Sequence, residues 1–446
     1  MEFIQILGLV LGIAVLIVGA YKGFAALPLT LIASFVIMIT NQMNVWTGFS
    51  QYYMGGYVGT YMMLFLLLAS SSMYANFMDK SGSATAIGYK LIDWFGKKRV
   101  MLVTTLIVAV LTYGGVSLFV LMFVIVPVAY LLFKEANLPR HLLMAPMLAG
   151  SATFTMTSLP GTPALTNVIP TAFLGTTLTA APVMGIIASV MLFVLAYLYM
   201  VYAEKKAVAS GDGWSYPDNI DPTAYEASRD KGTLPPAIIA FLPMILLLLS
   251  LVIGSVLFPD AEAIMIACIG MLVGTLSCFL LNIERFKGKS KKDLVTRGLE
   301  GGITAISALA AVVAFGAVVS NSAGFQHIVV WLLGLNMNPY VHGVLATAVI
   351  SGVTGSSSGG LQIMYGNEHL LAHFLANVPD LNVLHRLTAI AAGTLDTLPH
   401  AGGLFLAFSV LRLNHKSAYK HVFWASVAPA IIVTAIMLVA TVLFIT

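Results

Sequence analysis

Apolar runs of roughly 20 residues, the length of a membrane-spanning helix, recur along the chain between short polar connections. Because an α-helix rises about 1.5 Å per residue, one such run crosses a hydrocarbon core of about 30 Å. The runs predict two groups of spanning helices, near residues 3–20, 24–40, 57–77 and 183–203, and near residues 237–258, 263–282, 301–320 and 421–445. The pattern indicates an all-α integral membrane protein.

Other apolar segments are interrupted by clusters of Gly, Pro, Ser and Thr. They are the paired runs 100–112 with 118–133 and 341–352 with 361–376, and the longer segments 140–178 and 384–413, broken at 157–163 and 396–403. A lone Gly or Pro often only kinks a helix. Four interruptions in matching order instead predict two re-entrant hairpins and two broken helices, which a membrane protein tolerates only inside protein or along a cavity.

The same order of segments occurs in both halves of the chain. We expect a first repeat at residues 1–203, a cytoplasmic linker at 204–236 and a second repeat at 237–446. Each repeat would contain one hairpin, giving about ten spanning segments and two hairpins in all. Lys and Arg accumulate in cytoplasmic loops. The basic clusters around Lys97 and Lys289 therefore predict that these loops lie inside, that both termini lie outside, and that the repeats are inverted.

Composition excludes a water-soluble fold. Hydrophobic residues make up 59% of the chain, charged residues 9%, and the mean hydropathy is +0.94. Soluble domains are about half apolar and about a quarter charged. The run at 3–20 follows Glu2 and lacks a small-residue cleavage pattern, so we expect the first spanning helix rather than a removed signal peptide. A multi-pass protein of the cell membrane is the expected localisation.

Inverted repeats with broken helices are typical of secondary transporters, whose binding site lies near the bilayer midplane. Interrupted helices expose N–H groups and the positive end of a dipole, which together bind an anion. We therefore expect a small organic carboxylate as substrate, bound without a Lys or Arg in direct contact. The candidate substrate-binding residues are Gly114, Gly115, Ser117, Ser158, Gly161, Thr162, Asn167, Ser356, Ser357, Ser358, Gly359, Thr397 and Gly402. Any single hydroxyl among them could instead bond its own helix carbonyl.

Asp396 is the one acidic residue that this topology places deep in the membrane. Ionisable groups at that depth are costly and usually functional. His400 follows four residues later, within reach if the segment is helical. The two residues could form a proton-coupling site, or a structural pair in which Asp396 caps the restarting helix.

Several short motifs carry a resemblance to a known family. They are residues 113–117, 135–140, 159–163 and 356–361, and above all His385-Arg386 followed by the stretch 395–400, Leu-Asp-Thr-Leu-Pro-His. These motifs resemble the gluconate permease (GntP) family of the ion transporter superfamily, in particular its 3-hydroxybutyrate permease branch. The similarity covers essentially the whole chain. Residues 401–403, Ala-Gly-Gly, replace a more polar pair of that branch, so the exact substrate stays open.

The resemblance implies proton-coupled uptake of a hydroxylated monocarboxylate such as 3-hydroxybutyrate or gluconate. It also implies a homodimer of scaffold and transport domains that works by elevator-type alternating access. Sodium coupling is the alternative, because hydroxyls and carbonyls at broken helices bind Na⁺ well. No cofactor, metal or nucleic acid partner is expected. A channel gains nothing from inverted hairpins, and an intramembrane enzyme would need a partner carboxylate or base that the sequence does not offer.

Overall fold

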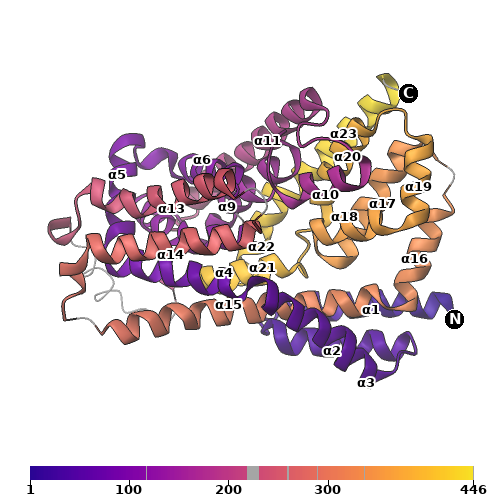
Figure 1. The fold of residues 1–446 in the computed structure, drawn as a ribbon, viewed down its shortest axis with the longest axis horizontal. Helices are drawn as coiled ribbons and strands as arrows, with labels where there is room; N and C mark the ends of the chain where they lie inside the picture. Colours follow the sequence, from indigo (N-terminus) through magenta and orange to yellow (C-terminus); the bar gives the residue numbers. More distant parts are fainter. Residues whose placement is uncertain (117, 218–230, 259–260, 289, 336, 445–446) are drawn as a thin grey trace.

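The computed structural model describes residues 1–116, 118–217, 231–258, 261–288, 290–335 and 337–444, and all regular structure in these ranges is helical. Figure 1 shows an elongated bundle in which the longest helices follow the long axis. Both chain termini lie at the same end of this axis, and α5 (Ser83–Phe95) lies at the other end. The all-α membrane fold expected from the apolar runs is confirmed.

Seven helical stretches in the described residues are long and apolar enough to cross a membrane. They are α1 (Glu2–Tyr21), the stretch Val45–Lys80 that ends in α4 (Met54–Lys80), α11 (Pro182–Ala209), α13 (Ala237–Leu257), α14 (Ala263–Leu281), α15 (Lys291–Ser320) and the stretch His415–Phe444 that contains α22 (His415–Val422) and α23 (Ala428–Phe444). Shorter apolar helices are α2 (Ala26–Thr40), α10 (Leu165–Leu174), α16 (Ala323–Leu333), α17 (Pro339–Thr354) and α21 (Gly402–Leu411).

The two expected hairpins are more broken than the sequence suggested. The first consists of α6 (Val100–Tyr113) and a second arm that bends by 54° between α7 (Leu118–Val124) and α8 (Val126–Glu135). The second consists of α17 and an arm divided into α18 (Ser357–Gly366) and α19 (Glu368–Asn377). Pro127 at the start of α8 and the Asn367 cap before α19 explain where the arms divide.

Two connections that were expected to be loops are helices, and this expectation was wrong. Residues 83–95 form α5, and residues 323–333 form α16. In α5 the buried residues Ala84, Ile87 and Leu91 recur at helical spacing, but the helix is too short and too polar to register as a span. A count of basic residues alone could not separate such a surface helix from a loop.

Long helices pack side by side in one part of the molecule. α4 packs along α15, α14 packs on α4, and α2 packs on α15. A Cβ on Gly302 of α15 would lie only 2.7 Å from the Cα of Ala69, so glycine is needed for this close approach. On the other part of the bundle, α6 packs on α9 (Met144–Ser151) and α17 packs on α20 (Leu381–Leu395).

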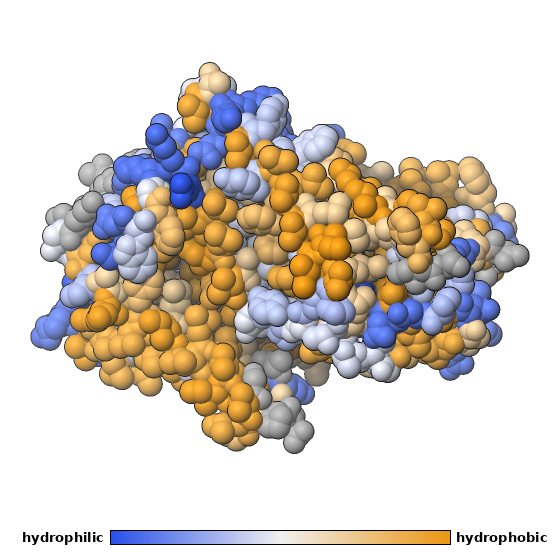
Figure 2. All heavy atoms as spheres, turned by 90° about the horizontal axis from the view of Figure 1, so that it is seen from above, coloured by the Kyte–Doolittle hydropathy of each residue, from blue (hydrophilic) through white to orange (hydrophobic). Residues whose placement is uncertain are grey.

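The outer surface is suited to lipid. Figure 2 shows apolar residues over most of the face, with hydrophilic residues gathered toward the two ends of the long axis. Large apolar side chains such as Met62, Ile238 and Val183 are exposed on the long helices. A surface of this kind is stable only in contact with lipid hydrocarbon or another apolar partner.

Candidate functional site

The first break joins the tip of the first hairpin. It runs through residues 159–164, between the π-helical turn Phe154–Ser158 and α10. The Tyr113 hydroxyl, at the end of α6, donates to the Pro160 carbonyl at 3.0 Å. A Cβ on Gly115, which has a φ of +94°, would lie 3.5 Å from Pro163. The hairpin tip and the break therefore form one contiguous structure.

The second break has the same relation to the second hairpin. It comprises residues 396–401, between α20 and α21. The ring of His400 donates through Nε2 to the Gly352 carbonyl at 2.9 Å. A Cβ on Gly355, the left-handed residue that ends α17, would lie 3.2 Å from the Cα of Ala401. Hairpin tip and helix break again meet.

The half-helices that restart after the breaks have no side-chain caps. α10 begins after Ala164 and α21 begins after Ala401, and neither residue can accept a hydrogen bond through its side chain. By contrast, Ser356 caps α18 by accepting from the Gly359 N–H at 3.1 Å. The first N–H groups of α10 and α21, and the positive ends of their dipoles, are thus available to an anion.

Several predicted residues line these breaks, and some of them already make hydrogen bonds within the protein. Ser158 and Thr162 are fully buried at the first break. Asn167 makes three hydrogen bonds: its amide nitrogen donates to the carbonyls of Thr162 and Leu178, and its oxygen accepts from His385. Both N–H groups of this buried side chain are therefore used within the protein, and it cannot donate to a substrate.

The remaining candidates differ in accessibility. Ser357, Ser358 and Gly359 are partly exposed at the second hairpin tip, whereas Gly402 packs against Leu309. The Thr397 hydroxyl lies 3.5 Å from the Ser426 hydroxyl. Gly114 lies at the first tip, Gly161 donates its N–H to the Leu178 carbonyl, and Ser117 lies outside the described residues.

Asp396 and His400 do not form the expected pair. The segment between α20 and α21 is a series of turns, so the helical spacing that would bring the two side chains together is absent. His400 bonds Gly352 on the hairpin instead, and Ala401 rather than Asp396 is the N-cap residue of α21. The Asp396 carboxyl faces the hydroxyls of Ser357 and Thr397, and its Oδ1 has no hydrogen-bond partner in the structure.

Two neighbouring residues that were only part of a family motif organise the first break. His385 accepts from the Thr176 hydroxyl at Nδ1 (2.7 Å) and donates from Nε2 to Asn167 (3.0 Å). Arg386 donates to the carbonyls of Ala180 and Leu178. Both side chains are fully buried. Their polarity within an apolar run was the signal that could have identified them.

The second break is held by α22. His415 donates through Nε2 to the Pro399 carbonyl at 2.8 Å, and the Tyr419 hydroxyl donates to the Thr397 carbonyl at 3.3 Å. These residues were not predicted, because their basic and polar neighbours suggested a loop before the last helix. A cavity of about 320 Å³ opens beside His415, between the α1–α2 connection, α15 and α21.

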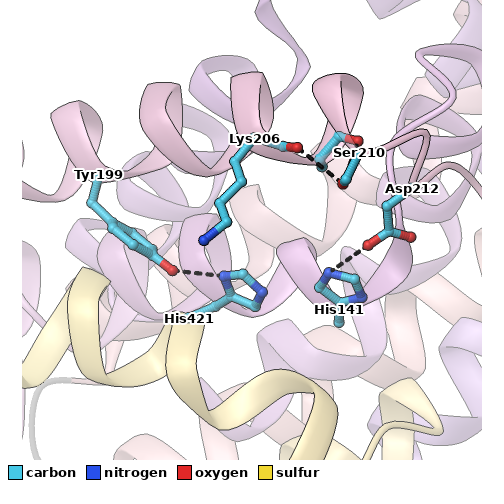
Figure 3. Close-up of polar contacts among 7 residues, drawn as sticks. His141, Tyr199, Lys206, Ser210, Asp212 and His421 are labelled. Carbon is cyan, nitrogen blue, oxygen red and sulfur yellow. Dashed lines mark hydrogen bonds and ion pairs between the residues drawn. The ribbon is translucent and has the colours of Figure 1, made fainter.

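A separate polar cluster lies away from both breaks, where α11 ends (Figure 3). Tyr199 bonds His421 at 2.8 Å, the His421 ring stacks on the His141 ring at 5.0 Å, and His141 lies 3.4 Å from the Asp212 carboxylate. His141 lies outside the long apolar helices, and burial lowers its pKa below the usual value although Asp212 opposes this shift. The cluster fastens the start of the linker to the helices.

The fold is that of a multi-pass helical membrane protein, and its family identifies it as a membrane transporter. The family model "GntP family permease" matches residues 4–444, and this chain belongs to that family. A curated relative, the "Uncharacterized transporter YxjC" of Bacillus subtilis (strain 168), is 31% identical over 95% of both chains. These similarities indicate a transporter rather than an enzyme.

A solved structure also resembles the fold. It is that of Neisseria gonorrhoeae MtrF, described in connection with a class of antimetabolite efflux pumps. The match covers 88% of this chain and 84% of that chain, with 13% sequence identity and a TM-score of 0.42. At this level the similarity says nothing about substrate or mechanism.

Proposed function

We propose that the protein is a secondary active transporter that takes up a small hydroxylated monocarboxylate, such as 3-hydroxybutyrate or gluconate, together with protons. One observation carries the proposal: two half-helices, α10 and α21, start without side-chain caps after the helix breaks, and the second break begins with a buried carboxyl group, Asp396, that lacks an ion-pair partner among the described residues. Helix N-termini suit a carboxylate. A buried carboxyl suits a proton.

In this proposal the substrate binds at the helix breaks and the hairpin tips. The uncapped N–H groups would bind the carboxylate, and the hydroxyls of Ser357, Ser358 and Thr397 would bond the hydroxyl groups of the substrate. Asn167 takes part indirectly, since it holds the first break in shape. The partly exposed second hairpin tip is the accessible part of this site.

The packing supports two further parts of the proposal. α1 packs on α2 as α13 packs on α14, and α6 packs on α9 as α17 packs on α20, which fits inverted repeats at 1–203 and 237–446 around the linker 204–236. The paired helices α4 and α15 would form the scaffold of a homodimer, and the hairpins and broken helices would move against it as an elevator. Both termini would lie outside.

A transport assay tests the function directly. In proteoliposomes, counterflow of gluconate, 3-hydroxybutyrate, lactate and citrate should reveal one preferred hydroxymonocarboxylate. An inwardly directed proton gradient in sodium-free buffer should drive its accumulation. Accumulation that requires a sodium gradient and does not respond to a proton gradient would show that Na⁺ is the coupling ion. The hydroxyl-rich second hairpin tip favours this alternative. Failure of every carboxylate to exchange would reject the proposed substrate class.

Orientation can be tested in the same protein. Lys98 is exposed near the start of α6 and is expected inside. A single cysteine in its place should resist impermeant thiol reagents in intact cells and react after permeabilisation. A cysteine at Glu2, whose side chain is 78% exposed beside the N-terminus at the opposite end of the molecule, should react in intact cells. The reverse pattern would invert the topology.

A further inference from the structure

Arg386 is a buried cation without an anionic partner. It lies on α20 about three turns before Asp396 and is fully buried. Nε and Nη2 donate to the Ala180 carbonyl at 3.1 and 2.9 Å, and Nη2 also lies 3.3 Å from the Leu178 carbonyl. Nη1 has no hydrogen-bond partner. No ion pair in the described part of the chain includes this side chain.

A buried charge with only partial compensation is costly. Carbonyl dipoles offset part of the desolvation of a guanidinium, but a nearby anion would offset far more. Charged residues kept within membrane segments usually serve the transported ligand or ion. We propose that Arg386 supplies the positive charge of the substrate site and thereby sets its preference for a carboxylate over an uncharged analogue. The inference rests on the proposed function and adds a positive charge near the site, while the substrate is still bound without a Lys or Arg in direct contact.

The position of Arg386 links it to the first break. A Cβ on Gly185 of α11 would lie 2.6 Å from the Ser158 carbonyl oxygen and 3.2 Å from Arg386 Nε, so the guanidinium group lies beside the residue where the break begins. α10, whose uncapped N-terminus follows the break, packs on α20. The charge of Arg386 and the dipole of α10 therefore act on the same region with the same sign.

The same side chain also shapes the break. The Leu178 carbonyl accepts from Arg386, from the Asn167 amide at 2.8 Å and from the Gly161 N–H at 2.8 Å. His385 adds a second connection through Asn167. Arg386 is consequently a positioning residue as well as a source of charge, and an experiment must separate the two roles.

The charge acts at a distance in this conformation. Nη1 is enclosed by protein, so the guanidinium group attracts an anion through the low-dielectric surroundings rather than by direct contact. For a separation of roughly 10 Å and an effective dielectric constant near 20, Coulomb attraction corresponds to a preference on the order of tenfold. This is the effect that a charge-removing variant should abolish.

Arg140 provides a matched control. It is 8% exposed, and its guanidinium group likewise bonds carbonyls, those of Leu411, Arg412 and Tyr216, as well as the Tyr130 hydroxyl, and no ion pair in the described residues includes it. Nε of Arg140 is also without a partner. The residue lies at the end of α21 that is far from the second break. A purely structural role predicts similar behaviour for the two arginines, whereas the proposal predicts different substrate selectivity.

The experiment compares a charged and an uncharged competitor. Counterflow of labelled 3-hydroxybutyrate in proteoliposomes is inhibited with unlabelled 3-hydroxybutyrate or with its amide, and the ratio of the two inhibition constants is measured. Arg386→Gln should lower the preference for the acid by about tenfold or more. Arg140→Gln should keep the wild-type ratio even if less protein folds, because the ratio does not depend on the amount of transporter.

A second variant covers the case in which Arg386→Gln does not fold. Arg386→Lys keeps the charge but not the three carbonyl bonds, and a buried lysine can lose its proton. We expect a raised KM with a normal acid-to-amide ratio near neutral pH, and a ratio that falls as pH rises only in this variant. A wild-type acid-to-amide ratio in folded Arg386→Gln, or a pH-independent ratio in Arg386→Lys, overturns this inference but leaves the proposed transport function in place. If the wild type exchanges no carboxylate, the proposed function fails first.

Discussion

The two breaks both lie between half-helices and contact a neighbouring hairpin tip, but they have opposite electrostatic character. The first break is surrounded by a hydrogen-bond network that includes a buried cation, Arg386, and Asn167, which makes three hydrogen bonds within the protein. The second break has a buried carboxyl, Asp396, with an unpartnered oxygen, and His400 has an unpartnered Nδ1. The comparison suggests different roles for the two breaks. The first break attracts the substrate anion, and the second provides a group that can gain and lose a proton.

The largest effect should come from the second break. Asp396→Asn removes the titratable group but keeps the shape, so proton-driven accumulation should be abolished while substrate exchange continues, since exchange need not move a net proton. The measurement is uptake driven by a pH gradient beside counterflow in the same vesicles. Asp380→Asn is the matched control, because Asp380 caps the other end of α20 and asparagine caps a helix equally well. Normal proton-driven uptake by Asp396→Asn would remove the distinction between the breaks.

The next effect concerns how tightly each break is packed. A Cβ at Gly185 would clash with the Ser158 carbonyl at 2.6 Å, whereas a Cβ at Gly403 would have its nearest neighbour, Leu118, at 3.8 Å. Gly185→Ala should destabilise the protein by about 1–3 kcal/mol. Gly403→Ala should be neutral or slightly stabilising. Thermal unfolding in detergent measures both, and equal midpoints would show that the first break is not the more rigid of the two.

Removing side-chain hydrogen bonds at each break should have a third effect, on stability and on substrate affinity, of intermediate size. Asn167→Ala would leave the Thr162 carbonyl and the His385 N–H without their partner, at a cost of about 1–3 kcal/mol. Thr397→Val removes a hydroxyl that lies 3.5 Å from Ser426 and faces the Asp396 carboxyl, but it leaves the carbonyls of Thr397 and Pro399 bonded to α22 and should cost less. We expect Asn167→Ala to raise the KM for substrate as well as lower the unfolding midpoint. An unchanged KM would mean that the network around Asn167 supports the fold but not the site.

The smallest effect should arise outside both breaks. Burial lowers the pKa of His141, so the folded state disfavours the protonated ring, and stability that is present above the unfolded pKa of about 6.5 is lost as the pH falls below it. His141→Gln should therefore reduce the loss of thermal stability between pH 7 and 5, while transport at pH 7 stays normal. A steeper loss in the variant would mean that the attraction of Asp212 outweighs burial.

The sequence alone determined the membrane fold and the places where helices are interrupted. Apolar runs of spanning length specify helices because the backbone cannot bond to lipid, and Gly, Pro and hydroxyl clusters mark where the helices stop. The breaks at 159–164 and 396–401 fall within or beside the interruptions read from residues 157–163 and 396–403. Asp396 was identified as a deeply buried acid, and it is 7% exposed.

Tertiary structure decided which side chains at the breaks are not used in hydrogen bonds within the protein. Spacing along the chain placed His400 beside Asp396, but the turns after α20 direct His400 to Gly352 instead. The sequence suggested Asn167 as a substrate ligand, but its oxygen accepts a hydrogen bond from His385, more than 200 residues away. Arg386 appeared in the sequence only as part of a family motif, and packing against α11 and residues 178–180 buries it at the first break. Such contacts depend on helices distant in sequence, so no local pattern could reveal them.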